Sequence, residues 1–320
     1  MMGGNRIIGV GSYLPKRRVS NEMLAQTLDT TDEWIRERTG ITQRHIAAEG
    51  EYTSHLAAAA AQAALAEAEV EAHEIDLIII ATATPDTSFP STATHVQKLL
   101  GASRAVAMDV NAACAGFVYA LHVANALMHH IGYRHALVIG AETMSRVTDW
   151  NDRRTAILFG DGAGACVLRA TNERTRGILT STIASDGTYT DLLHTDGGVS
   201  TTQTAGVLFM EGKEVFRHAV EKMCQSVELC CARAGITPKE LRLLVPHQAN
   251  ARILAACAKR LGLQDHQCVM SVEHHANTSA ASIPLALDFA KKNVILEQGD
   301  YVIFTALGAG FTWGSCLVRW

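Results

Sequence analysis

Several common sequence features are scarce or absent in this chain, and each absence excludes a class of protein. The eight cysteines form neither a CxxC pair nor a Cys/His zinc spacing. We therefore expect free thiols rather than a disulfide framework, and no metal site. A net charge of −4 provides no global positive field that would attract nucleic acid. We expect no nucleic-acid partner.

Signals of export and of membrane insertion are also missing. The first 15 residues contain no charged segment followed by a long apolar core, so we expect no signal peptide. The longest apolar stretches fall short of a membrane span. We therefore expect a cytoplasmic protein without membrane contacts.

The chain does contain enough apolar sequence for an extensive core. Apolar residues make up 48% of the 320 residues and charged residues 19%. This composition favours a globular protein with one large or two medium domains and argues against disorder. Strand-like runs alternate with helix-like runs, which predicts a layered α/β protein whose buried strands are largely parallel.

The most informative stretch is NAACAGF at residues 111–117. It follows a strand-like run over 105–110 and precedes a helix-like run over 115–128. That second run is apolar almost all round, which is typical of a helix inside a protein. Cys114 is thus expected at a strand-to-helix turn, where the positive end of the helix dipole favours a thiolate. Taken alone, the pattern fits either a reactive nucleophile or a buried structural cysteine.

Local signals place other elements in the first half of the chain. Further strands are expected over 7–10, 75–81 and 135–139, and helices over 21–28 (with Asn21 as N-cap), 33–39 and 53–69. Residues 82–94 are interpreted as a loop. The stretch FGDGAG at 159–164 superficially resembles a phosphate-binding loop, but a ribose-binding acid at the usual spacing is missing. We interpret its glycines as permitting close packing near the site.

The second half repeats this organisation, which indicates an internal duplication. Each of the strands over 75–80 and 241–245 is followed, at the same distance, by a turn of small residues that opens an apolar helix. These turns are Ala112–Ala115 and Thr278–Ala281. The other elements expected in this half are strands over 177–185, 207–210 and 301–305 and a helix over 211–234. We place the two halves at 1–172 and 173–320, and expect corresponding turns to meet between them.

Polar side chains occur beside these strand ends. His247 follows a strand within PHQAN, and Asn277 precedes the second small turn within HANTSA. Alone, His247 could be a structural histidine and Asn277 a helix cap. A cysteine, a histidine and an asparagine at converging turns together favour a catalytic site. A Cys/His hydrolase is less favoured, because the carboxamide of Asn277 stands where such an enzyme could use a water-activating base.

Six stretches, in order and spread over essentially the whole chain, resemble the β-ketoacyl-acyl-carrier-protein synthase III family. They are DTTDEWI (29–35), NAACAG (111–116), FGDGAG (159–164), PHQAN (246–250), NTSAAS (277–282) and GFTWGS (310–315). The resemblance implies a thiolase-like αβαβα fold and a homodimer. It also implies condensation of a short acyl-CoA with malonyl-acyl-carrier protein, which starts type II fatty-acid synthesis, without a cofactor.

The same resemblance assigns roles to individual residues. Cys114 would accept the acyl group, and His247 and Asn277 would stabilise the malonyl thioester oxygen during decarboxylation. The backbone N–H groups of Cys114 and Ala309 would form an oxyanion hole. Ala309 stands where the family usually has glycine, and Leu307 replaces a common aromatic residue. The length of the acyl primer therefore stays open.

The resemblance also implies binding sites for CoA and for the carrier protein. Trp34 would stack on the adenine. Without the resemblance, Trp34 could equally be a residue that anchors a surface flap to the body of the protein. The other CoA contacts would come from Thr30, Arg38, Arg153, Asn250 and Arg252. The carrier-protein contacts would come from Gln248, Arg217, Arg252 and Lys259. Phe89 would reach across the dimer to close the partner's acyl pocket, and Arg154 departs from a common glycine.

Two alternatives stay open beside the synthase. One is a related condensing enzyme with a longer acyl primer or another acceptor, acting in secondary metabolism. The other is a non-catalytic homologue that binds acyl-CoA, against which the intact set of Cys114, His247 and Asn277 argues.

Overall fold

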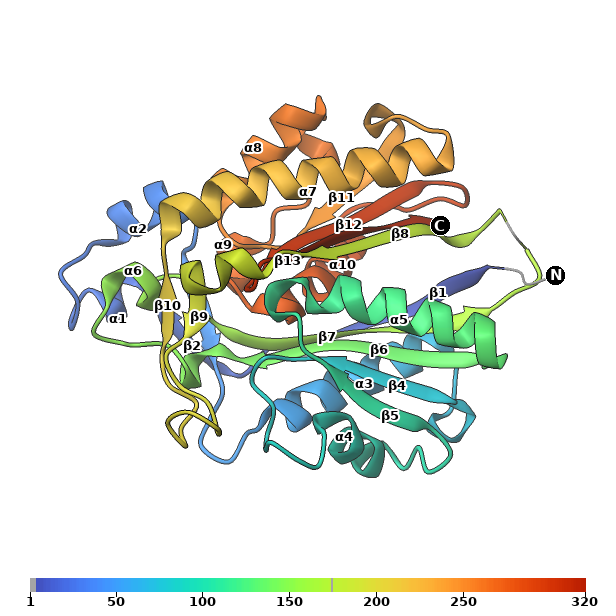
Figure 1. The fold of residues 1–320 in the computed structure, drawn as a ribbon, viewed down its shortest axis with the longest axis horizontal. Helices are drawn as coiled ribbons and strands as arrows, with labels where there is room; N and C mark the ends of the chain where they lie inside the picture. The colour runs from blue at the N-terminus through green and yellow to red at the C-terminus, as the bar shows by residue number, and fades with distance from the viewer. Residues whose placement is uncertain (1–3, 174) are drawn as a thin grey trace.

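A computed structural model describes residues 4–173 and 175–320. Its helices and strands are stacked in five layers, in the order helix, sheet, helix, sheet, helix (Figure 1). This arrangement confirms the αβαβα fold predicted from the sequence. Within the described residues, no helix has the length and apolar character needed to cross a bilayer.

The first sheet has its strands in the order β1-β7-β6-β4-β5. These strands are β1 (Asn5–Tyr13), β4 (Leu77–Ala81), β5 (Val106–Val110), β6 (His135–Thr143) and β7 (Asp161–Ala170). β4 runs parallel to β5 and β6, whereas β7 is antiparallel to β1 and β6. Every residue of β4 and β6 is buried because helices cover both faces of the sheet.

The second sheet repeats this arrangement in the order β11-β12-β13-β8. Its strands are β8 (Gly177–Ser185), β11 (Leu241–Pro246), β12 (Tyr301–Gly308) and β13 (Thr312–Arg319). β11 and β12 are parallel, and the other two pairs are antiparallel. The prediction of largely parallel strands is therefore wrong. A continuous apolar run signals a buried strand but carries no information on its direction.

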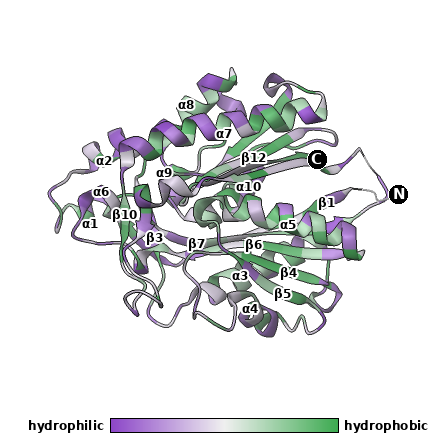
Figure 2. Ribbon diagram, in the orientation of Figure 1, coloured by the Kyte–Doolittle hydropathy of each residue, from purple (hydrophilic) through white to green (hydrophobic). Residues whose placement is uncertain are grey.

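The helices form the three remaining layers. The first outer layer consists of α3 (Thr53–Ala68) and α4 (Thr92–Leu100). The middle layer consists of α5 (Gly116–Ile131) and α10 (Ser282–Asn293). The second outer layer consists of α7 (Gly212–Ala234) and α8 (Ala251–Leu261). Hydrophobic residues are concentrated along the strands and on the buried sides of the helices (Figure 2). α4 begins inside the predicted loop over 82–94 and was not predicted.

The glycines of the FGDGAG stretch allow α10 to lie close to β7. A Cβ atom added to Gly164 would come within 2.7 Å of the backbone nitrogen of Leu285. This confirms the interpretation that the glycines serve close packing. The stretch also begins strand β7, which the sequence did not predict because glycine is unfavourable in strand interiors.

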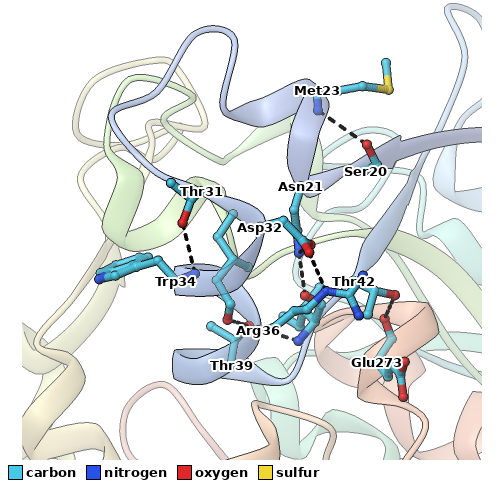
Figure 3. A network of polar contacts seen from close by, with 12 residues as sticks. Ser20, Asn21, Met23, Thr31, Asp32, Trp34, Arg36, Thr39, Thr42 and Glu273 are labelled. Carbon is cyan, nitrogen blue, oxygen red and sulfur yellow. Dashed lines mark hydrogen bonds and ion pairs between the residues drawn. The ribbon is translucent and has the colours of Figure 1, made fainter.

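Short elements surround the end of the sheets where the two small turns lie. They are β2 (Arg17–Ser20), α1 (Asn21–Leu24), α2 (Asp32–Thr39), β3 (Gln43–Ile46), α6 (Arg153–Ala156), β9 (Leu193–Thr195), β10 (Leu208–Met210) and α9 (Val272–His275). The helix predicted over 21–28 ends at Leu24, and its N-cap is Ser20 rather than Asn21 (Figure 3). The buried Asn21 side chain instead donates to Asp32 Oδ1 over 2.8 Å, which ties α1 to α2.

The two turns of small residues have the same conformation and touch each other. Each is a 3-10 turn, Ala113–Ala115 before α5 and Ser279–Ala281 before α10. Ala113 and Ser279 occupy the same place in the two turns, and both are left-handed, with φ of 44° and 49°. The corresponding turns therefore meet as the sequence predicts. The proposed boundary between residues 172 and 173 falls in the connection from β7 to β8 and stays a prediction.

Candidate active site

Cys114, His247 and Asn277 line a single cavity of about 300 Å³. Cys114 lies in the turn after β5, His247 follows β11 directly, and Asn277 precedes the turn that opens α10. All three are buried, with exposed fractions of 8%, 4% and 6%. Side chains that are far apart in the sequence thus share one cavity at the meeting point of the two halves.

The surroundings of the Cys114 sulfur oppose its ionisation. Burial raises the pKa of this thiol to about 11, and the charge of Glu142 acts in the same direction. The Ser279 hydroxyl and the Cys114 backbone N–H oppose the shift but do not cancel it. Burial thus acts against the thiolate that the helix start was expected to favour.

His247 is held from its Nδ1 side. That nitrogen lies 2.7 Å from Ser282 Oγ, which also accepts the backbone N–H of Gln248 at 3.2 Å. Burial lowers the pKa of His247 to about 4, so its ring is neutral near pH 7. Nε2 is then the ring nitrogen left for the cavity.

Asn277 is oriented by a short-range hydrogen bond. Its Oδ1 accepts the backbone N–H of Ser279 at 2.9 Å, which directs the amide Nδ2 to the opposite side. Its backbone N–H donates to the Leu158 carbonyl at 2.9 Å, and its carbonyl accepts from the Gly160 N–H at 3.1 Å. Asn277 therefore makes the cap-like hydrogen bond that the sequence suggested and also lines the cavity.

The end of β12 closes the cavity beside Cys114. Leu307 and Ala309 both line it. Gly308 lies so near that an added Cβ atom would come within 2.9 Å of the Cys114 backbone nitrogen. The Thr312 hydroxyl donates to the Ala112 carbonyl at 2.9 Å and fixes the two segments together. The Ala309 backbone is thus held against the turn that carries the sulfur.

A tryptophan flanked by two arginines lies on α2. The guanidinium carbons of Arg38 and Arg153 lie 5.5 Å and 5.1 Å from the Trp34 ring centroid. Thr31 caps α2 by accepting the Trp34 N–H at 3.1 Å, and the indole points away from the neighbouring Asp32–Arg36 pair (Figure 3). Thr30 has a buried hydroxyl without a hydrogen-bond partner among the described residues.

Two further predicted residues stand at or near the cavity on α8. Asn250 lines the cavity and caps the helix, its Oδ1 accepting the Ile253 N–H at 3.0 Å. The Arg252 guanidinium lies 5.9 Å from the ring of Phe216, which also lines the cavity. α2 adjoins the start of this helix, since a Cβ atom on Gly40 would lie 2.6 Å from that of Ala251.

Gln248 is misassigned as a carrier-protein contact. Its side chain has no exposed surface, and its amide nitrogen donates to the carbonyls of Pro246 and Val269 at 2.8 Å and 3.0 Å. Its oxygen accepts two backbone N–H groups at the start of α9. With its hydrogen bonds made inside the protein, Gln248 braces the turn that carries His247 instead of contacting a partner.

The remaining predicted residues lie on the surface. Phe89 is 85% exposed and is not part of the cavity wall of this chain. Arg217 pairs with Glu214 at 2.8 Å on α7, and Lys259 is exposed on α8. Arg154 does not disrupt its loop, because its Nε donates to the Asp152 carboxylate at 3.0 Å in the first turn of α6.

The sequence missed two polar residues that influence the Cys114 thiol. Glu142, the residue before the last of β6, has no exposed surface, and burial raises the pKa of its carboxyl to about 7. Ser279 lines the cavity next to Asn277. The signal for Glu142 was available, since a lone carboxylate inside a continuous apolar run is rare without a specific purpose.

Comparisons with known proteins agree over the whole chain. Models described as 3-oxoacyl-[acyl-carrier-protein] synthase III and its C-terminal part match residues 108–187 and 231–320. A β-ketoacyl-[acyl-carrier-protein] synthase III from Rhodospirillum centenum is 56% identical over 317 residues, 98% of each chain. A protein of the same name from Paramagnetospirillum magneticum is 53% identical over 323 residues, 100% of each chain.

Solved structures show the same relationship. The 3-oxoacyl-[acyl-carrier-protein] synthase III of Aquifex aeolicus superimposes with a TM-score of 0.94 at 43% identity, covering 99% of this chain and 100% of that one. The enzyme of Pseudomonas aeruginosa gives 0.93 at 44% identity, covering 99% and 98%. The chain therefore belongs to the β-ketoacyl-[acyl-carrier-protein] synthase III family and is an acyltransferase.

Proposed function

We propose that this protein condenses a short acyl-CoA, most simply acetyl-CoA, with malonyl-acyl-carrier protein. The products are 3-oxoacyl-carrier protein, CoA and CO₂, and the reaction starts type II fatty-acid synthesis. The observation that carries the proposal is the shared cavity of Cys114, His247 and Asn277, about 300 Å³ in volume. One nucleophile and two neutral donors around one void suit a thioester that is first transferred and then extended.

In the first half-reaction Cys114 attacks the acyl-CoA thioester and keeps the acyl group as a new thioester. Covalent capture divides a difficult condensation into two simpler steps. Negative charge develops on the acyl oxygen in this step, and the backbone N–H groups of Cys114 and Ala309 are the proposed donors to it. The close approach of Gly308 to the Cys114 nitrogen supports this pairing.

In the second half-reaction malonyl-carrier protein loses CO₂, and charge develops on its thioester oxygen. The proposed donors are His247 Nε2 and Asn277 Nδ2. The Ser282 hydroxyl can donate to His247 Nδ1, which leaves the ring proton on Nε2. The bond from the Ser279 N–H to Asn277 Oδ1 leaves Nδ2 for substrate. Neither donor carries a negative charge that would repel the developing enolate.

The CoA moiety is proposed to lie along α2, α6 and α8. The indole of Trp34 would stack on the adenine, with Arg38 and Arg153 holding the nucleotide. A guanidinium already lies within 5.1 Å of this ring centroid, which supports a site for planar, charged groups. The unpartnered hydroxyl of Thr30 offers a further hydrogen bond. Asn250 and Arg252 would line the pantetheine path into the cavity.

A carrier protein would dock where α7 and α8 meet this entrance. Arg217, Arg252 and Lys259 present their charges on these two helices, and carrier proteins of this kind are acidic. A local basic rim can guide an acidic partner although the whole chain carries a net charge of −4.

A homodimer is proposed to form through β5. This strand is one of the two edge strands of the first sheet, and Val106 on it is 45% exposed. An exposed apolar edge strand is a ready template for pairing with a second copy. Phe89, at 85% exposed in a single chain, would then gain cover by reaching into the partner's acyl pocket.

A second candidate function differs from the first in the length of the acyl primer. Among solved structures, a priming β-ketosynthase from the R1128 polyketide pathway has a TM-score of 0.94 at 36% identity. A longer primer or another acceptor in secondary metabolism therefore stays an alternative. Leu307 and Ala309 in the cavity wall are the residues proposed to decide it.

Mass spectrometry of the intact protein tests both functions. The protein is incubated separately with acetyl-CoA and octanoyl-CoA, alongside a Cys114→Ser variant. We expect one acetyl group on the wild type, no octanoyl group, and no acylation of the variant. Octanoyl transfer would support the longer-primer alternative. Acyl-CoA binding without any acylation would refute the enzymatic proposal in favour of a binding protein.

A further inference from the structure

One arginine is enclosed in the body of the protein without a carboxylate beside it. Arg44 on β3 has no exposed surface, and within the described part of the chain it forms no salt bridge. Burial lowers the pKa of its guanidinium to about 10, so it remains a cation near pH 7. Charged side chains are almost never fully buried without specific partners. The groups that hold this guanidinium therefore need an explanation.

Three oxygens from separate segments accept hydrogen bonds from the guanidinium. Its Nη2 donates to the Ile157 carbonyl at 2.7 Å. Its Nη1 donates to Asn21 Oδ1 at 2.8 Å and to the Val19 carbonyl at 3.3 Å. The planar fork of the arginine thus joins the start of α1 and strand β2 to the segment over 157–160, which connects α6 to β7.

The segment over 157–160 in turn holds the backbone of Asn277. The Leu158 carbonyl accepts the Asn277 N–H at 2.9 Å, and the Gly160 N–H donates to the Asn277 carbonyl at 3.1 Å. Arg44 also lies against the far end of this segment, since a Cβ atom added to Gly160 would come within 3.1 Å of the Arg44 Cβ. The side chain of Arg44 therefore contacts both ends of the segment to which Asn277 is bound.

The chain beside Arg44 also holds the residues that precede Asn277. The backbone N–H and the hydroxyl of Thr42 both donate to the Glu273 carbonyl at 2.9 Å (Figure 3). Between α9 and Asn277, Ala276 has a left-handed backbone with a φ of 57°. A residue other than glycine keeps such a conformation only where its surroundings impose it. The place of Asn277 thus depends on contacts with distant parts of the chain.

We propose that Arg44 is a positioning residue for Asn277, acting through the segment over 157–160 on the decarboxylation of malonyl-carrier protein. A donor stabilises a developing oxyanion only at the right distance, so a small shift of this segment weakens the hydrogen bond from Asn277 Nδ2. Cys114 is carried by the other small turn, so acyl transfer depends far less on Arg44. This inference rests on the proposed function of the site.

The coupling between Arg44 and Asn277 separates positioning from a purely structural role. If Arg44 acts through Asn277, removal of the Asn277 amide leaves nothing for Arg44 to position. Its replacement should then cause no further loss of rate. If Arg44 only stabilises the fold, the two losses are independent and their factors multiply.

The test uses Arg44→Met, which keeps a long side chain but removes every donor. Acetylation of Cys114 is followed by intact mass and decarboxylation by CO₂ release from malonyl-carrier protein, both at saturating substrate. We expect CO₂ release to fall about 10–100-fold, with little change in acetylation. In an Asn277→Ala background, Arg44→Met should lower CO₂ release by less than about twofold. Arg17→Met, at an exposed arginine of β2, should match the wild type.

Arg44→Lys provides a second variant that keeps the buried cation if Arg44→Met fails to fold. Its single ammonium group cannot hold both sides of the contact at once. It should therefore show the same selective loss of CO₂ release, smaller in size, and none beside Asn277→Ala.

Each outcome decides the inference. Equal losses in the two half-reactions would overturn it, as would a full further loss in the Asn277→Ala background. Wild-type CO₂ release by either folded variant of Arg44 would overturn it too. A wild-type protein that is never acetylated at Cys114 would instead refute the proposed function.

Discussion

Replacement of Asn277 separates the two half-reactions that the site is proposed to perform. Asn277 Nδ2 is assigned to the malonyl thioester oxygen and has no role in the attack by Cys114. Asn277→Ala removes this donor, and Asn277→Asp replaces it with a carboxylate of nearly the same shape. Both variants should therefore accept an acetyl group but fail to decarboxylate malonyl-carrier protein efficiently.

The magnitudes follow from the contacts of the side chain. Loss of one preorganised donor to a developing oxyanion lowers kcat by about 10²–10³-fold. Asn277→Ala also deprives the buried Ser279 N–H of its acceptor, which destabilises the fold by about 1–3 kcal/mol. Asn277→Asp keeps an oxygen at that acceptor position, so its free energy of unfolding should stay closer to that of the wild type. Its decarboxylation rate should nonetheless fall at least as far.

The assay measures the half-reactions separately. Acetylation is followed by intact mass after mixing with acetyl-CoA, and decarboxylation by CO₂ release when malonyl-carrier protein is added to enzyme that already carries acetyl. Urea unfolding provides the stability control. Equal losses in the two half-reactions would refute the assignment of Asn277, as would wild-type CO₂ release by Asn277→Ala.

Three further predictions address the CoA site, the buried carboxyl and the dimer. Trp34→Ala should raise the KM for acetyl-CoA about tenfold with little change in kcat, because base stacking contributes about 1–3 kcal/mol; Arg36→Ala on the same helix should leave KM unchanged. The pKa of Glu142 rises on folding to about 7, so its contribution to stability is full at low pH and is lost as pH rises through 7. Glu142→Gln should therefore gain roughly 2–3 kcal/mol relative to wild type between pH 5 and pH 8 in urea unfolding; a constant difference would contradict the assignment. Val106→Lys on the edge of β5 should give a monomer in analytical ultracentrifugation, whereas Ile295→Lys, at another exposed apolar residue, should remain a dimer.

The sequence predicted those parts of the site that depend on local pattern. Cys114, His247 and Asn277 each stand where a recognisable strand or turn ends, and the duplicated order of elements predicted that these places would meet. The boundaries of β8 were also predicted correctly, because its apolar run is bounded by clear turn signals.

The errors share a physical cause, which is that burial is a property of the whole fold. Gln248 follows His247 in a polar stretch, and nothing local indicates that its amide is fully enclosed. Local reasoning likewise considered the helix start at Cys114 but not the burial that raises the pKa of its thiol. Glu142 was overlooked because its enclosure depends on donors from the distant segment after β4, among them Thr82 and Thr84.

The two small turns explain how a duplicated fold came to hold one site rather than two. Ala113 and Ser279 adopt the same left-handed backbone although only the first turn carries a nucleophile. Such a conformation in a residue other than glycine costs about 1–2 kcal/mol, so close packing between the halves must favour it at both places. A Cβ atom on Gly140 would come within 2.3 Å of the Ala280 carbonyl oxygen, which shows how tightly the second turn fits the first sheet. At the position of Cys114 the second turn has Ala280, and its polar residues lie just before it. The first turn thus supplies the sulfur, while Asn277 and Ser279 from the second line the same cavity, so the cavity wall is built from both halves.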